Sequence, residues 1–221
     1  MSINKKHLII AICIIFFSIT GCKRGNESNL EDIFFRTVTI TIESTDNKKY
    51  HGTGVIIDNN SILTVAHLFT EEIDSIKYLY VRSADMDIKT PEIEKIDRNI
   101  DLALLKVSSI SDYERIDFSN ENVAYSDNVM FFGYTNGYGL VYREGYVTKH
   151  QTMFQYGESE RNVFFISNTV NMGDSGSPVF DNDYDFIGIL SFKLNSNYGQ
   201  PIYEFSAVIP VDVVLNFLSS K

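Results

Sequence analysis

Residues 171–178 have the sequence NMGDSGSP, which places Ser175 directly after an acidic residue and before a second glycine. Gly173 and Gly176 can adopt backbone turns that a side chain would forbid. Such a turn can lift the Ser175 hydroxyl into a cleft and point neighbouring N–H groups at one spot. Acyl transfer needs a nucleophile with hydrogen-bond donors placed where negative charge develops. The segment therefore predicts a nucleophilic serine, although Gly-Asp-Ser-Gly also occurs in ordinary turns.

Two upstream segments supply the partners that such a serine requires. A short apolar run, residues 61–67, ends on His67, and the apolar run at residues 101–107 opens with Asp101. A histidine can take the serine proton, and an aspartate can orient the histidine. Taken alone, His67 is more often a core histidine and Asp101 a turn or cap residue. The order His67, Asp101, Ser175 is that of the trypsin-like clan, whereas other well-known folds with this triad use different orders.

With these motifs the chain resembles bacterial trypsin-like serine proteases of the chymotrypsin clan. It is most similar to the protease domain of HtrA-type proteins, without their PDZ domain, and shares some features with glutamyl endopeptidases. The similarity extends from about Ile33 to Leu218. The segments that carry it are residues 52–57, 64–67, 101–107, 133–134, 144–148, 187–189 and 207–210.

The strand pattern agrees with an all-β fold. Residues 37–42 alternate with period two and are rich in β-branched side chains, as a half-buried strand requires. Many similar short runs follow, separated by turn-rich segments, which is typical of a sandwich or barrel. The resemblance implies two Greek-key six-stranded β-barrels and a C-terminal helix. We expect barrel one at about 33–120, barrel two at about 121–210 and the helix at 211–219.

The resemblance also implies a role for each candidate residue. Ser175 would be the nucleophile, and His67 would act as general base and then as general acid. Asp101 would hold the other imidazole nitrogen and stabilise the imidazolium. The backbone N–H groups of Gly173 and Ser175 would form the oxyanion hole. The catalytic residues would then come from both barrels, with the cleft between them.

The substrate-binding residues are expected, by position, at Thr169, Leu190, Ser191 and Lys193. Thr169 is not acidic, which argues against a strict preference for Arg or Lys before the cut. Glutamyl endopeptidases have a histidine where Leu190 stands, so that specificity is also disfavoured. A small or medium apolar residue before the cut is the default expectation.

Asp174 departs from the HtrA-type pattern, which has asparagine at this position. In trypsin-like digestive enzymes the corresponding aspartate pairs with an N-terminal amine that activation frees. Here that amine would lie on an acylated Cys22, far away on a tether, so the same switch is disfavoured. We expect Asp174 to accept local backbone hydrogen bonds instead.

The N-terminus has the pattern of an export signal. Lys5 and Lys6 precede an apolar stretch at residues 8–19, which is shorter than the roughly 20 residues of a membrane span. Ile19-Thr20-Gly21-Cys22 resembles a lipobox, the cleavage and acylation site of bacterial lipoproteins. We therefore expect a signal peptide at 1–21, an acylated Cys22 and tether at 22–32, and the protease domain at 33–221. The alternatives are a simple secretory signal or an uncleaved anchor, with Cys22 incidental.

These features predict a domain lipid-anchored to a bacterial membrane and facing the periplasm or exterior. Of the two cysteines, Cys13 would leave with the signal and Cys22 would carry lipid, so no disulfide is expected. The net charge of −10 argues against nucleic acid as a partner, because the acidic protein and the phosphate backbone would repel each other. The oligomeric state is left open.

No cofactor or metal site is expected, because the histidines are scattered and no Cys-x-x-Cys exists. Residues 181–185 resemble part of a calcium loop, but they lack its glycine and terminal glutamate, so a hairpin turn is favoured.

The leading functional hypothesis is a serine endopeptidase that cleaves envelope or extracellular proteins through an acyl-enzyme. The alternative is a non-catalytic or adhesive lipoprotein that keeps the protease fold. An esterase with the same triad is a third possibility.

Overall fold

The computed structural model describes residues 24–69, 75–84, 88–108, 110, 113, 115–156, 159–195 and 201–220. The side chains of residues 24–28, 156, 193–195 and 201–204 are not described. The chain divides into two compact units, residues 1–32 and residues 33–221. The expected signal peptide and Cys22 lie outside the described residues.

Helix α2 spans Arg24–Arg36, where the sequence predicted an irregular tether up to residue 32. The prediction overlooked the spacing of Leu30, Ile33 and Phe34, which is that of one helical face. Ile33 is buried. Among the described residues, no helix combines the length and apolar character that crossing a bilayer requires.

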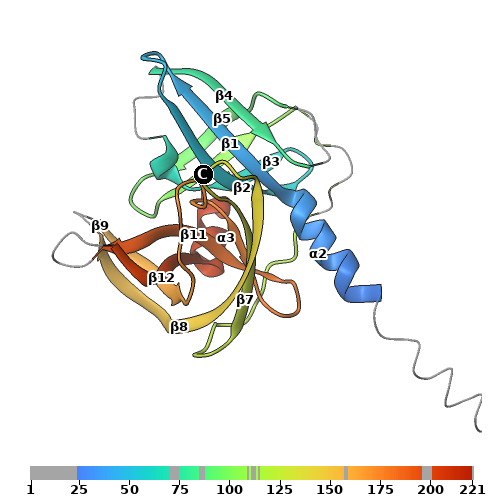
Figure 1. Ribbon diagram of the computed structural model, residues 1–221, viewed down its shortest axis with the longest axis vertical. Coiled ribbons are helices and arrows are strands. Elements are labelled where there is room, and N and C mark those ends of the chain that lie inside the picture. The colour runs from blue at the N-terminus through green and yellow to red at the C-terminus, as the bar shows by residue number, and fades with distance from the viewer. Residues whose placement is uncertain are drawn as a thin grey trace, which may run out of the picture. The chain divides into compact units, whose positions relative to one another are not determined.

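The first half of the larger unit is a six-stranded antiparallel sheet with the order β4-β1-β2-β3-β6-β5 (Figure 1). In β1 the valine and isoleucines at positions 38, 40 and 42 are buried, and the threonines between them at 39 and 41 are half-buried, as the period-two pattern predicted. A short 3-10 helix, η1 at Ala66–Leu68, follows β3. The strands are β1 Thr37–Ser44, β2 Lys49–Asp58, β3 Ser61–Thr64, β4 Ile76–Arg82, β5 Glu92–Asp97 and β6 Leu102–Lys106.

The second half is a closed barrel with the order β10-β11-β12-β9-β8-β7. Its interior is filled by a buried apolar cluster that includes Phe131, Phe164, Leu190 and Val208. Closure leaves no free sheet edge, so every strand of the barrel has two neighbours. The strands are β7 Asn128–Tyr134, β8 Leu140–Tyr156, β9 Ser159–Ile166, β10 Pro178–Phe180, β11 Phe186–Asn195 and β12 Pro201–Pro210.

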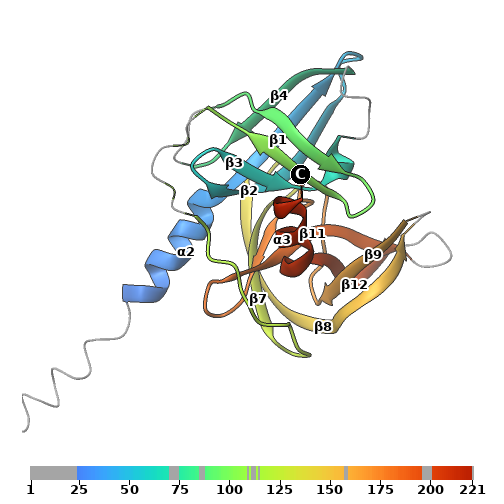
Figure 2. The ribbon, with the colours of Figure 1, turned by 180° about the vertical axis from the view of Figure 1, so that it is seen from behind.

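Helix α3, Val211–Ser219, ends the chain and packs beside β11 and β12 (Figure 2). Its Val214 and Phe217 are buried. The Lys95 side chain on β5 donates to the Phe217 carbonyl at 2.6 Å, so the helix also contacts the first sheet. The all-β class, the two six-stranded units and the C-terminal helix are thus confirmed. The short strands β3, β5 and β10 and the extension of β8 to Tyr156 were not predicted.

The interior aromatic side chains of the barrel generate a stability prediction. Phe164 has no exposed surface, so Phe164→Ala should lower the free energy of unfolding by about 3–5 kcal/mol through lost burial and a residual cavity. Phe164→Leu should lose less. Urea denaturation measures both, and Tyr138→Ala is the control, because Tyr138 is 87% exposed. Wild-type stability in a folded Phe164→Ala protein would contradict this account of the core.

Candidate active site

The sheet register brings His67 and Asp101 together. Strands β3 and β6 are antiparallel neighbours, and Thr64 pairs with Ala103. His67 follows the end of β3 within η1, and Asp101 directly precedes β6, so both lie at the same end of this strand pair. A backbone hydrogen bond of 3.1 Å from the Ala66 N–H to the Asp101 carbonyl fixes the two turns to each other. Asp101 has a φ of +64°, in the left-handed region that few residues other than glycine adopt.

The Asp101 carboxylate accepts two hydrogen bonds from His67. The backbone N–H of His67 donates to Oδ1 at 2.8 Å, and ring Nδ1 lies 2.9 Å from Oδ2. An ionised carboxylate only accepts, so the ring proton is on Nδ1 and Nε2 is the nitrogen left with a free lone pair. The His67 side chain is 37% exposed, whereas that of Asp101 is 1% exposed. Asp101 therefore orients the imidazole from its buried Nδ1 edge, and part of the ring remains accessible to solvent.

Two further groups from the closed barrel reach the same carboxylate oxygen. The Ser191 hydroxyl on β11 donates to Oδ2 at 2.5 Å, and Arg161 Nη1 on β9 lies 3.1 Å from it. Burial alone would raise the pKa of Asp101, but the hydrogen bond and charge of His67, the Ser191 hydroxyl and the Arg161 charge outweigh it and lower that pKa. The carboxylate is thus held ionised inside the protein.

Ser175 lies in the loop between β9 and β10 and shares a groove with His67. This groove has a volume of about 570 Å³ and is lined by Ser175, Gly173 and His67, together with Lys49, Tyr50, His51, Leu68, Asn136, Gly137 and Met172. The Ser175 hydroxyl donates to the Ser191 carbonyl at 3.2 Å. The structure therefore joins His67 to Asp101 directly and places Ser175 in the same groove as His67, with its hydroxyl directed to Ser191.

The backbone around Ser175 has the conformation that the sequence predicted for its glycines. Gly173 and Gly176 have φ values of +94° and +90°. A Cβ at Gly173 would stand 2.0 Å from the Tyr134 carbonyl, and one at Gly176 would stand 1.9 Å from the Thr53 carbonyl. Only glycine fits both the dihedral angles and the space.

Two N–H groups of this loop are available as donors. The Met172 carbonyl accepts from the Asn136 N–H at 2.8 Å, and because a trans peptide places C=O and N–H on opposite sides, the Gly173 N–H points away from Asn136. Within the described part of the chain, the N–H groups of Gly173 and Ser175 have no hydrogen-bond acceptor. These are the two groups that the sequence predicted as an oxyanion hole.

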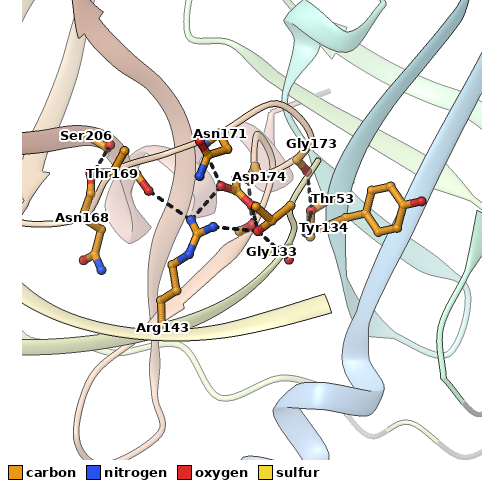
Figure 3. A network of polar contacts seen from close by, with 12 residues as sticks. Thr53, Gly133, Tyr134, Arg143, Asn168, Thr169, Asn171, Gly173, Asp174 and Ser206 are labelled. Carbon is orange, nitrogen blue, oxygen red and sulfur yellow. Dashed lines mark hydrogen bonds and ion pairs between the residues drawn. The ribbon is translucent and has the colours of Figure 1, made fainter. Parts of the chain in front are cut away.

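A buried ion pair underlies the loop (Figure 3). Asp174 is fully buried, and its Oδ2 accepts from Arg143 Nη1 and from the Asn171 N–H, both at 2.7 Å. Thr135 bridges the same two side chains, accepting from Arg143 Nη2 and donating to Asp174 Oδ1, both at 2.7 Å. Arg143 also donates to the Thr169 carbonyl at 3.0 Å. The expectation that Asp174 accepts only local backbone hydrogen bonds was therefore incomplete, because sequence reasoning missed Arg143.

The described side chains among the expected substrate-binding residues lie outside the groove that contains Ser175 and His67. The Leu190 side chain belongs to the barrel cluster, and the Ser191 hydroxyl is engaged by Asp101. Thr169 is exposed, and the Lys193 side chain lies outside the described residues. Thr169, Leu190 and Ser191 are not among the residues that line the 570 Å³ groove. Their role in specificity stays a prediction.

The aspartates at residues 181–185 form a turn between β10 and β11. The N–H groups of Asp183 and Asp185 both donate to Asp181 Oδ1 at 3.0 Å. Across the described residues, no group of three or more His, Cys, Asp or Glu side chains is arranged to hold a metal ion.

The Arg143–Asp174 pair gives a test by double-mutant cycle. Arg143→Met should lower the free energy of unfolding by about 3–5 kcal/mol, because it leaves a buried carboxylate without its cation. In an Asp174→Asn background the same substitution should lower it far less. Urea denaturation of the four proteins measures the coupling, and strictly additive losses would contradict the assignment of Arg143 as the counterion of Asp174.

The sequence and the fold both match known peptidases. The family model for the trypsin-like peptidase domain matches residues 52–189, which is more than half of the chain. The magnetosome formation protease MamE of Magnetospirillum gryphiswaldense is 27% identical over 141 residues, which cover 62% of this chain but only 18% of that protein. The chain thus spans less than a fifth of the length of this curated relative.

Two solved structures show the same fold. The active form of the Rv3671c protease from M. tuberculosis has a TM-score of 0.75 and 20% identity, over 88% of this chain and 84% of that one. The HtrA-type protease AlgW with a tripeptide has a TM-score of 0.75 and 18% identity, over 87% of this chain and 62% of that one. The double-barrel fold is thereby confirmed, and the family match shows that the chain belongs to the trypsin-like peptidase domain family.

Proposed function

We propose that this peptidase is a serine endopeptidase that uses Ser175 as nucleophile, His67 as base and Asp101 as the orienting acid. The observation that supports it best is the pair of contacts between His67 and Asp101, with Ser175 and two unused N–H donors in the same groove. A binding module has no need for this combination of a nucleophile, an oriented base and donors for an oxyanion.

In the proposed reaction, His67 Nε2 takes the proton of the Ser175 hydroxyl as Oγ attacks the scissile carbonyl carbon. The carbonyl oxygen becomes negative and accepts hydrogen bonds from the Gly173 and Ser175 N–H groups. The imidazolium, stabilised by Asp101, then donates its proton to the leaving amine as the C–N bond breaks. Water, deprotonated by His67, hydrolyses the resulting ester and restores the serine.

The reaction requires the Ser175 hydroxyl to leave the Ser191 carbonyl and face His67. A hydroxyl reorients by rotation about one side-chain bond between staggered positions, and a net hydrogen bond contributes only about 0.5–1.5 kcal/mol. Catalytic hydrogen bonds are often poorly aligned before substrate binds. The observed rotamer is therefore compatible with the proposed nucleophile.

A fluorophosphonate probe tests this proposal. Such a probe forms a covalent bond only with a serine that a neighbouring base activates, so wild-type protein should be labelled, and Ser175→Ala and His67→Ala should lose at least about 99% of the labelling rate. Ser219→Ala is the matched control, because Ser219 is an exposed serine on α3. Absence of labelling in folded wild-type protein would favour the alternative, a non-catalytic or adhesive lipoprotein.

A hydrolysis assay with peptide substrates distinguishes a peptidase from an esterase. Internally quenched peptides with small or medium apolar residues before the cut should be hydrolysed by wild-type protein and not by Ser175→Ala. Turnover of activated esters without cleavage of any peptide in the panel would favour the esterase.

We further propose that the chain is exported and lipid-anchored through Cys22, so that its substrates are proteins of the envelope or the exterior. The support is the lipobox pattern at residues 19–22 after a short apolar segment. In bacteria that carry the full chain, wild-type protein should incorporate labelled palmitate and fractionate with membranes. Cys22→Ser should lose the label, and Cys13→Ser is the control. Unchanged incorporation in Cys22→Ser would contradict the lipoprotein proposal.

A further inference from the structure

A second buried arginine lies against the proposed catalytic aspartate. Arg161 is on β9 of the closed barrel, whereas Asp101 belongs to the turn before β6 of the first sheet. Arg161 Nη1 lies 3.1 Å from Asp101 Oδ2, the same oxygen that faces His67 Nδ1 at 2.9 Å. Both charged side chains are nearly fully buried, at 9% and 1% exposure. Their attraction is therefore little screened by water.

The surroundings of Arg161 hold it in this position. Its Nη2 donates to the Arg98 carbonyl at 3.4 Å, and its guanidinium carbon lies 5.9 Å from the centre of the Phe192 ring. In the β8–β9 pairing, Arg161 lies opposite Phe154. The arginine thus has contacts with both halves of the domain, and its guanidinium is directed at the carboxylate that orients His67.

We infer that Arg161 is a positioning residue of the triad, which fixes Asp101 Oδ2 toward the His67 ring and offsets part of the carboxylate charge. The inference rests on the proposed role of Asp101 and His67. A lone carboxylate beside an imidazole stabilises the protonated ring, and a protonated ring cannot accept the Ser175 proton. A cation on the same oxygen weakens that stabilisation, so removal of the Arg161 charge should favour the protonated ring.

The charged groups around the ring are few among the described residues. Asp101 and Arg161 lie on its Nδ1 side, and Lys49 and His51 on β2 line the groove that His67 shares with Ser175. Lys49 pairs with Glu43 at 3.5 Å. The pKa of His51 is lowered, first by burial and then by the Lys49 charge. His51 is the group whose titration must be separated from that of His67.

The test follows the second-order rate of fluorophosphonate labelling of the full chain between pH 5 and 9. Arg161→Gln should move the midpoint of the acidic limb upward by roughly half a pH unit or more, and it should reduce the labelling rate near pH 6 several-fold. Arg161→Lys keeps a cation and should retain the wild-type midpoint. Arg98→Gln is the matched control, because it removes an exposed arginine charge next to the same turn and should also leave the midpoint unchanged. Repeating the series in a His51→Gln background removes the other titrating ring.

A labelled Arg161→Gln protein with the wild-type midpoint would overturn the inference and leave the proposed function intact, whereas unlabelled wild-type protein would overturn the function itself. If Arg161→Gln does not fold, Arg161→Met replaces it, because methionine keeps much of the aliphatic part of the side chain without its charge. The titration of the His67 ring, followed by NMR, should again move upward when the cation is removed. No change in that midpoint would also overturn the inference.

Discussion

The architecture of the site depends on one buried carboxylate. Asp101 is almost fully buried in a turn of the first sheet, and a buried charge without partners is strongly destabilising. Its partners come from three different elements, which are His67 on η1, Arg161 on β9 and Ser191 on β11. Two of these elements belong to the closed barrel. The contact between the two halves of the domain and the orientation of the imidazole are therefore consequences of the same requirement.

The loop that carries Ser175 also contains a buried carboxylate with a cationic partner from a distant part of the chain. Asp174 is fully buried, and Arg143 on β8 neutralises it through a contact of 2.7 Å. The backbone of Gly133 packs directly against this carboxylate. A Cβ at this position would stand only 2.6 Å from Asp174 Oδ1, so a side chain there would collide with it. On the other side, the Thr53 hydroxyl of β2 donates to the Gly173 carbonyl at 2.7 Å. These fixed contacts hold the N–H groups of Gly173 and Ser175 in place within the folded chain, and donors that are already oriented stabilise a developing charge without reorganisation.

Much of the site could be predicted from the sequence, and the parts that could not share a physical reason. His67, Asp101 and Ser175 stand in short local motifs, and the pairing of β3 with β6 brings the first two together. Arg143 and Arg161 stand in no motif, because they act through contacts with residues far away in the chain. One signal was available: Arg161 is in phase with Val163 and Phe165 on β9, so strand alternation places it on a buried face. A buried arginine implies an anionic partner, but the period-two pattern cannot say which of the aspartates it meets.

Ser191 joins the two halves of the proposed mechanism. Its hydroxyl donates to Asp101 and its carbonyl accepts from the Ser175 hydroxyl, so one residue contacts both the proposed orienting acid and the proposed nucleophile. The sequence assigned Ser191 to the substrate pocket, which stays a prediction; its side chain is fully buried, and its hydroxyl donates to the Asp101 carboxylate. The hydrogen bond of the Ser175 hydroxyl is long at 3.2 Å, whereas the buried Asp101 carboxylate has four contacts of 2.5 to 3.1 Å, one of them with the Arg161 guanidinium. The proposed nucleophile is thus held by one long hydrogen bond, whereas the proposed acid and base are joined by two.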